Sequence, residues 1–392
     1  MTVTNQNDCA LAHTLDMGED GLRVAIKDCI DIKGMVSACG SAALKDSAPA
    51  TTNAAVVDNI LTHGCKIIGK ANMHELAYGM TGVNAVFGTP VNPKWPDRIP
   101  GGSSSGSAVA VAAGRCDFAI GTDTGGSVRQ PAICCGVYGI KPTFGRVSRD
   151  GCHPKESSLD CVGVFARTAA MLTKGMEAID PTFKRQLLTK APRLARVKST
   201  VEKKLGDALV YALMEGLPDA AYVTLPHMEA AFDAGMTVIG AETVAAFGPL
   251  VDAGKPLGAD IRSRLLKAHE ITDENLRSAE DIRATFTSEV DAIFEDYDVL
   301  VTPALPVIPP TLSEAEDPAT VLPLTKLLRP FNLSGHPAIV LPISVGPDHL
   351  PAGIQIIGRK GEDAFLCATA EWLTKTLSVF QTASQPEDTH DR

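Results

Sequence analysis

The hydrophobic pattern begins with alternating apolar and polar residues over 22–32, which predicts a strand with Lys27 near its middle. A helical period follows over 52–64, and the short apolar run at 65–70 predicts a buried strand. Strand, helix and strand in this order indicate a right-handed βαβ unit and therefore a parallel sheet core. The next segment, 71–93, is rich in Gly and Asn, so we expect a short helix and then a long surface loop of the kind that lines binding sites.

Helical periods dominate the second half of the chain before the sheet pattern returns. In the region from about 180 to 298, helices are predicted over 208–216, 228–247, 258–269 and 275–294. Strands are predicted at 299–303, 338–343 and 353–358, with a strand running into a helix at 159–170 and a final helix at 363–376. The pattern as a whole predicts an α/β protein with a helix-rich subregion at about 180–298.

Two Gly-Gly-Ser turns, at 101–103 and 125–127, divide the central segment 100–146. A linker would be polar throughout, whereas the residues between these turns, 108–113 and 118–120, are apolar and periodic and should be buried. Glycine leaves backbone N–H groups unobstructed, so turns of this kind inside a buried segment favour a functional site.

Two familiar interpretations of these turns are disfavoured. Residues 102–106 match the G-x-S-x-G nucleophile elbow with Ser104 as nucleophile, but the elbow needs a buried strand before it, and the preceding WPDRIP contains two prolines. A phosphate cradle would require a pattern such as G-x-x-x-x-G-K-[ST], which does not occur in the sequence.

The third interpretation treats both turns as one site. Residues 125–127 present successive backbone N–H groups, as a hole for a developing oxyanion requires, at a place where the Ser127 hydroxyl could attack. Serine is a weak nucleophile without a nearby base, and Ser103 and Lys27 are the candidates. From the pattern alone, Lys27 could instead be a solvated lysine that points away from the core.

This combination is similar to the amidase signature hydrolases. Their signature is a Gly-Gly-Ser-Ser-Gly-Gly/Ser segment followed at a fixed interval by Gly-Thr-Asp-x-Gly-Gly-Ser-x-Arg, and the matching residues are GGSSSGS at 101–107 and GTDTGGSVR at 121–129. The interval between the two serines, 127 minus 103 or 24, is the family's. Matching segments cover nearly the whole chain, most weakly at about 180–298. The resemblance implies a single amidase signature domain over 1–392, with a central mixed, largely parallel β-sheet covered by helices on both faces.

The resemblance also implies a Ser-Ser-Lys triad, with Ser127 as nucleophile, Ser103 as the bridging residue after a cis peptide bond, and Lys27 as general base. The implied oxyanion hole consists of the backbone N–H groups of Thr124, Gly125, Gly126 and Ser127. A lysine base has to be neutral at rest, which requires burial beside hydroxyls and away from carboxylates. We therefore expect Asp28 and Asp31 to point elsewhere.

Substrate-binding candidates lie in segments that surround the site in the family, at Met80, Arg129, His153 and Asn332. Arg129 has a second interpretation, a structural ion pair with Asp123. The expected function is an amidohydrolase that cleaves the C–N bond of a small carboxylic amide, or of a carbamoyl or ureido compound, through a serine acyl-enzyme, and needs no cofactor. Two rivals stay open: the glutaminase (A-type) subunit of a tRNA-dependent amidotransferase, and a non-catalytic scaffold with the same fold.

Composition narrows the partners and the location. The net charge is −10, and the basic segment 193–204 contains apolar residues and Glu202, which predicts a solvated helix face and no direct nucleic-acid partner. No stretch of about 20 apolar residues is visible, and the N-terminal segment lacks a signal-peptide pattern, so we expect no membrane partner and a cytoplasmic protein. The ten cysteines and nine histidines show no metal-ligand spacing, and the cysteines should be buried, reduced residues. A homodimer is compatible with the resemblance.

Overall fold

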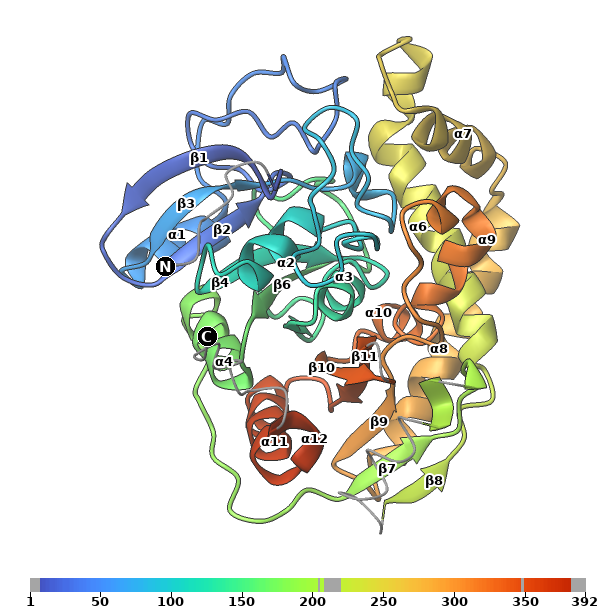
Figure 1. The fold of residues 1–392 in the computed structure, drawn as a ribbon. Coiled ribbons are helices and arrows are strands. Elements are labelled where there is room, and N and C mark those ends of the chain that lie inside the picture. The colour runs from blue at the N-terminus through green and yellow to red at the C-terminus, as the bar shows by residue number, and fades with distance from the viewer. Residues whose placement is uncertain (1–7, 204, 208–219, 347–348, 382–392) are drawn as a thin grey trace.

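The computed structural model describes residues 8–203, 205–207, 220–346 and 349–381 of the 392 in the chain. In this part, the strands form one 11-stranded sheet in the order β1-β3-β2-β4-β6-β5-β10-β11-β9-β7-β8 (Figure 1). The strands are β1 (Leu11–Gly18), β2 (Arg23–Lys27), β3 (Lys66–Ala71), β4 (Phe118–Asp123), β5 (Tyr138–Lys141), β6 (Cys161–Ala166), β7 (Leu194–Val197), β8 (Ala221–Val223), β9 (Val299–Pro303), β10 (Ala338–Val345) and β11 (Leu350–Ile357). The α-helices are α1 (Ala55–Thr62), α2 (Ser105–Ala112), α3 (Arg129–Cys134), α4 (Ala169–Ile179), α6 (Met228–Asp252), α7 (Ala259–Ala268), α8 (Asp273–Ile293), α9 (Pro318–Val321), α10 (Pro330–Leu333), α11 (Asp363–Thr376) and α12 (Ser378–Gln381), and short 3-10 helices lie at Glu75–Ala77, Glu314–Glu316 and Leu322–Thr325.

The parallel unit predicted near the start of the chain is confirmed. β2, α1 and β3 follow in the expected order, and β2 pairs in parallel with β3. β2 is shorter than predicted and ends at Lys27, because a turn then brings the Ile30 N–H to the Lys27 carbonyl oxygen at 3.0 Å. Beyond β3, residues 71–93 form the expected short helix and long loop.

The sheet is mixed, as expected, but it is not largely parallel. Four of the ten strand pairs in the described sheet are parallel, namely β3/β2, β2/β4, β9/β7 and β7/β8. The other six, from β1/β3 through the run β4/β6/β5/β10/β11/β9, are antiparallel. The expectation of a largely parallel sheet was wrong, because the parallel βαβ unit near the start of the chain is not repeated across the sheet. Short connections, such as the one between β10 and β11, can only join antiparallel neighbours.

Helices cover both faces of the sheet, as expected. Successive residues of a strand point to opposite faces, so Val24 and Ile26 of β2 pack in one apolar core with residues of α1, α4 and α11. Ala25, between them, packs in a second core with residues of α2 and α3. A third core joins α6, α8 and α10 to β7, β9 and β10. Figure 1 shows α6, α7 and α8 on one side of the molecule, with α4 and α11 far from them.

The region from about 180 to 298 contains helices where they were predicted and, in one place, a strand that was not. Three of its predicted helices appear as α6, α7 and α8, while the predicted helix at 208–216 lies outside the described residues. The segment 193–204, predicted as a solvated helix face, instead begins with strand β7, whose four residues are all buried. The reason is tertiary, because β7 lies between β9 and β8 and pairs in parallel with both.

Helix α6 also corrects the prediction that no apolar segment is long enough to cross a membrane. The sequence pattern ended this helix at Gly248 and Pro249, but the helix continues through Pro249 and reaches 25 residues. Among the described residues it is the one helix that is long and apolar enough to cross a membrane, judged by length and composition only. It packs against α7, α8 and α10 and contributes to the third core, as helices of a folded layer do.

Candidate active site

Lys27 stands at the end of β2, on the face covered by α2 and α3. It is fully buried, and its Nζ lies 2.8 Å from Ser103 Oγ and 2.8 Å from Thr122 Oγ1. The contact with Thr122 follows from the sheet, because β2 pairs in parallel with β4, which carries Thr122. The solvated-lysine alternative is therefore wrong, since this amine lies inside the protein between two hydroxyls.

The nearby carboxylates point away from Lys27, as expected. Asp28 lies 3.4 Å from Lys70 Nζ and accepts a hydrogen bond from the Gly40 N–H at 3.0 Å. Burial raises the pKa of Asp28, and the charge of Lys70 opposes that rise. Asp31 instead contacts His153 Nε2 at 3.0 Å. Both acidic neighbours are thus engaged elsewhere, and the hydrogen bonds of Lys27 go to hydroxyls and one carbonyl.

The first Gly-Gly-Ser turn holds Ser103 in place just before α2. The Gly102–Ser103 peptide bond is cis, as the resemblance implied. The Gly102 N–H donates to Gln130 Oε1 at 2.8 Å, and the Ser103 carbonyl oxygen accepts from the His74 N–H at 2.9 Å. The next residue, Ser104, donates its N–H to the Ser127 carbonyl oxygen at 3.3 Å. The two Gly-Gly-Ser turns are therefore adjacent in space.

The second Gly-Gly-Ser turn is shaped by the carboxylate of Asp123, the last residue of β4. This carboxylate accepts the backbone N–H groups of Gly126, Val128 and Arg129 at 2.8 to 3.2 Å. Gly126 has φ of 116°, a left-handed conformation that glycine adopts most readily, and a Cβ there would come within 3.0 Å of the Leu328 side chain. Ser127 is 9% exposed. The Gly126 N–H is thus already paired with Asp123, while Thr124, Gly125 and Ser127 complete the predicted set of oxyanion donors.

Arg129 and Asn332, two substrate-binding candidates, both bind Asp123. The guanidinium donates to both Asp123 carboxylate oxygens, to Leu328 O, to Gln355 Oε1 and to Asn332 Oδ1, which uses all five of its N–H groups. Asn332 Nδ2 donates to Asp123 O and Oδ1 at 2.7 and 2.8 Å. Burial would raise the pKa of Asp123, but the charge and hydrogen bonds of Arg129 hold it well below its usual range. Of the two interpretations of Arg129, the structure therefore supports the structural ion pair with Asp123 and not a contact with substrate.

The other two candidates lie on different sides of the serines. Met80 lies against the first turn, since a Cβ on Gly102 would come within 3.2 Å of the Met80 carbonyl carbon. Its carbonyl oxygen accepts from Gln130 Nε2 at 3.2 Å. His153 lies beyond Lys27, where its N–H donates to the Cys29 carbonyl oxygen at 2.9 Å and its ring contacts Asp31. Met80 thus lies beside the first turn, and His153 contacts residues that follow Lys27 in the chain.

Two residues beside these turns have no counterpart among the sequence predictions. Thr122 holds Lys27, and the signal that could have found it is a hydroxyl in an otherwise apolar strand just before the second turn. Arg329 precedes α10, is 5% exposed, and lies close to Gly125, where a Cβ would come within 3.0 Å of Arg329 Nε. Its signal is a cation inside the apolar run LLRPF. A threonine or an arginine at such a place does not indicate a functional site until its contacts in the folded chain are known.

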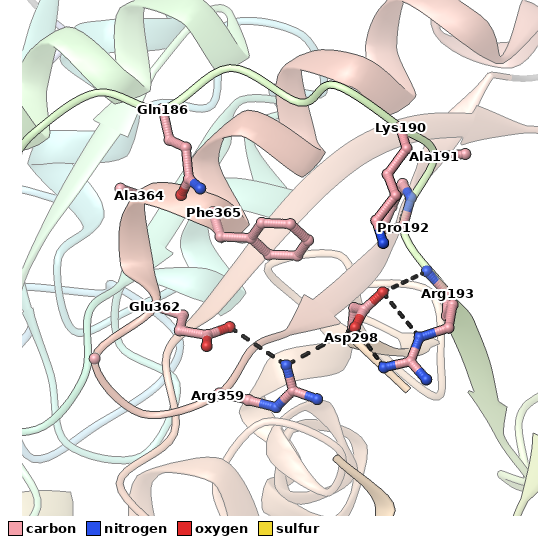
Figure 2. Close-up of a pocket in the computed structure, with 11 residues that line it drawn as sticks. Gln186, Lys190, Ala191, Pro192, Arg193, Asp298, Arg359, Glu362, Ala364 and Phe365 are labelled. Carbon is pink, nitrogen blue, oxygen red and sulfur yellow. Dashed lines mark hydrogen bonds and ion pairs between the residues drawn. The ribbon is translucent and has the colours of Figure 1, made fainter. Parts of the chain in front are cut away.

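Neither of the two hollows described on the structure is lined by Lys27, Ser103 or Ser127. Figure 2 shows one of about 440 Å³, in which Arg193 and Arg359 bind Asp298, and it contains no candidate nucleophile. The other, of about 450 Å³, is lined by His74, Arg264 and their neighbours on the loop and α7. We therefore locate the candidate active site by the hydrogen bonds and the burial of Lys27, Ser103 and Ser127, and not by a cavity.

The described residues offer no metal centre. Among them, no three His, Cys, Asp or Glu side chains are grouped so as to hold an ion. All ten cysteines are free thiols, and all are buried except Cys9, which is partly exposed.

Comparison with known proteins identifies what the chain resembles. The family model described as Amidase matches residues 20–210 and 169–367. The chain is 33% identical to the A subunit of the glutamyl-tRNA(Gln) amidotransferase of Halobacterium salinarum, covering 90% of this chain and 94% of that protein. It is 33% identical to "Amidase 1" of Oryza sativa subsp. japonica, covering 91% of each. A solved structure described as "Crystal structure of amidase" superposes with a TM-score of 0.83 at 29% identity, covering 91% of this chain and 85% of that one.

Proposed function

The chain belongs to the amidase signature family, and from this premise we propose that it hydrolyses a small carboxylic amide, or a carbamoyl or ureido compound, through a Ser127 acyl-enzyme. The products are an acid and ammonia or an amine. The observation that carries the proposal is the buried contact of 2.8 Å between Lys27 Nζ and Ser103 Oγ. It joins an amine that has no carboxylate partner among the described residues to the turn that lies against Ser127.

In the proposed mechanism, Lys27 acts as the general base. The Ser127 hydroxyl attacks the amide carbonyl carbon, its proton passes to Ser103, and the Ser103 proton passes to Lys27. Negative charge then develops on the carbonyl oxygen, and backbone N–H groups of the second turn stabilise it. Thr124, Gly125 and Ser127 supply these N–H groups, because that of Gly126 already donates to Asp123.

Breakdown of the tetrahedral intermediate completes acylation. The C–N bond breaks as the leaving nitrogen receives a proton returned from Lys27 through Ser103. A water molecule then attacks the acyl carbon, loses its proton to the same relay, and the acid leaves as Ser127 regains its proton. Thr122 supports the relay, since its hydroxyl lies 2.8 Å from Lys27 Nζ and fixes the amine opposite Ser103.

The glutaminase subunit of a tRNA-dependent amidotransferase is the second candidate. Its support is the 33% identity to the A subunit of such an enzyme over 90% of the chain. A glutaminase of this kind would hydrolyse glutamine and work with a partner protein, so ammonia release from glutamine that rises on addition of a partner would favour it. The scaffold alternative predicts no turnover of any amide. A homodimer and a cytoplasmic location stay predictions.

The test combines turnover with covalent labelling. Ammonia release is measured from small monoamides, ureido compounds and glutamine, and a fluorophosphonate probe reports a reactive serine. Ser127→Ala should remove labelling and lower kcat by about 10⁴-fold or more, and Lys27→Met by about 10³-fold or more. Ser104→Ala is the matched control and should leave labelling in place, because the hydrogen bonds of Ser104 Oγ within the described residues are to the Thr122 backbone.

Two results would contradict the proposal. Loss of labelling in Ser104→Ala with retention in Ser127→Ala would move the nucleophile to the disfavoured elbow. Near wild-type turnover by folded Lys27→Met, verified by circular dichroism, would exclude the lysine as the base.

A further inference from the structure

Arg329 is a buried cation without a carboxylate partner among the described residues. It is 5% exposed, and within the part of the chain that the structure describes its Nε and Nη1 atoms have no hydrogen-bond partner. In the same part, the one hydrogen bond of Nη2 is to Met80 Sδ, at 3.9 Å. Arg129 is a useful contrast, because all five of its N–H groups are used. Buried arginines are normally paired, so the open donors of Arg329 call for an acceptor that the protein itself does not supply.

Neighbouring residues hold the Arg329 side chain in position. The guanidinium stacks on Phe232 of α6, with 4.5 Å between its carbon and the ring centre. Two glycines leave room for it: a Cβ on Gly125 would come within 3.0 Å of Nε, and one on Gly235 within 2.8 Å of Cγ. Gly125 belongs to the second Gly-Gly-Ser turn, so the open donors lie against the loop that carries Ser127.

A second cation, Arg264, lies near enough to Arg329 to act on its charge. Burial lowers the pKa of Arg329 to about 10, and the charge of Arg264 adds to this effect. The side chain therefore stays protonated at neutral pH. Among nearby carboxylates, Asp123 is bound by Arg129, and Asp233 acts only at longer range. An anion placed here would gain from two cations, whereas a neutral group would leave the buried charge uncompensated.

We propose that Arg329 binds a carboxylate of the substrate, so that the enzyme acts on short amides or ureido compounds that carry a carboxylate as well as the scissile carbonyl. The inference rests on the proposed function and specifies its substrate class. Arg329 is a binding residue here and takes no part in proton transfer. The carboxylate would fix the substrate so that its amide carbonyl faces Ser127 and the N–H groups of the second turn.

The experiment compares pairs of substrates that differ only in charge. Succinamate is set against succinamide, and malonamate against malonamide, because the second carboxamide replaces the carboxylate with little change of shape. The wild-type enzyme should prefer the acid of each pair by about 10-fold or more in kcat/KM. Arg329→Met should lower kcat/KM for the acids by about 30-fold or more, mainly through KM, and change it for the diamides by less than about threefold. Arg329→Lys should retain part of the preference.

Controls separate this inference from the proposed function. Arg262→Met is the matched arginine control, because this guanidinium donates to Lys255 O outside the site and should keep the wild-type preference. If the wild type neither releases ammonia nor reacts with the fluorophosphonate, the proposed function fails. If it reacts but prefers the diamides, or if Arg329→Met slows both substrates equally, the inference alone is overturned.

A measurement on the wild type keeps the inference testable if the variants do not fold. Succinate should protect Ser127 against the fluorophosphonate at concentrations where succinamide does not. Equal protection by the two compounds, or none by succinate, would overturn the carboxylate site.

Discussion

Replacing Asp123 by Asn should destabilise the protein and disorder the second Gly-Gly-Ser turn, which carries the candidate nucleophile Ser127. Oδ1 accepts hydrogen bonds from the Gly126 N–H, Arg129 Nη2 and Asn332 Nδ2, and Oδ2 accepts from the N–H groups of Val128 and Arg129 and from Arg129 Nε. An asparagine turns one of these oxygens into a donor, so three donors lose their acceptor. It also leaves the fully buried Arg129 without a counter-ion.

The expected loss in the free energy of unfolding follows from removing one partner of a buried ion pair. Such a change costs about 3 to 5 kcal/mol, because the remaining charge stays buried and uncompensated. Three lost hydrogen bonds at roughly 1 kcal/mol each give the same order. Labelling of Ser127 by a fluorophosphonate should also slow, since whichever oxygen is replaced, at least one backbone N–H group of the loop around Ser127 loses its acceptor.

The assay is urea unfolding followed by fluorescence and circular dichroism, with the free energy of unfolding compared between variants. Asp16→Asn is the matched control, because Asp16 also forms an ion pair, 2.8 Å from Lys66, but its side chain is 78% exposed. An exposed pair of this kind contributes about 0 to 1 kcal/mol. A loss in Asp123→Asn no larger than that of Asp16→Asn would refute the reasoning.

The same residue predicts a dependence on pH. The pKa of Asp123 in the folded protein lies well below its ordinary value of 3.8. Its contribution to stability is therefore complete above about pH 4 and is lost as the pH falls through the folded pKa. The Asn variant should lack this part of the acid-side decline.

Three further predictions concern single side chains. Thr122→Val removes one of the two hydroxyls that hold Lys27 and should lower kcat by about 10-fold, the kinetic equivalent of one hydrogen bond, measured as steady-state ammonia release. Phe286→Ala, in the third core, should cost about 3 to 5 kcal/mol in urea unfolding with kcat unchanged, and a cost below 1 kcal/mol would contradict its 0% exposure. Burial lowers the pKa of His336 from 6.5 to about 4, so stability should be complete above pH 6.5 and fall as the pH drops toward 4. His336→Asn should flatten that slope, and an unchanged slope would contradict this assignment.

Much of the architecture could be predicted from the sequence because its signals are local. Long helical periods predicted α6, α7, α8 and α11, and apolar runs predicted β3, β9, β10 and β11. The two Gly-Gly-Ser turns and their spacing pointed to Ser103 and Ser127 through a family resemblance, and the family is confirmed. These features depend on neighbouring residues along the chain, so they are readable without a structure.

Only the tertiary structure decided which strands pair and which polar groups meet. The antiparallel run from β4 to β9 and the burial of β7 depend on partners that no local pattern identifies. Lys27 contacts Ser103 across 76 positions, and Arg129 binds Asn332 across 203. The sequence by itself therefore determined the long helices, several of the strands and the nucleophile candidate. The folded chain decided that Arg129 is satisfied by the protein while Arg329 is left with open donors, because burial and hydrogen bonding are properties of contacts between distant residues.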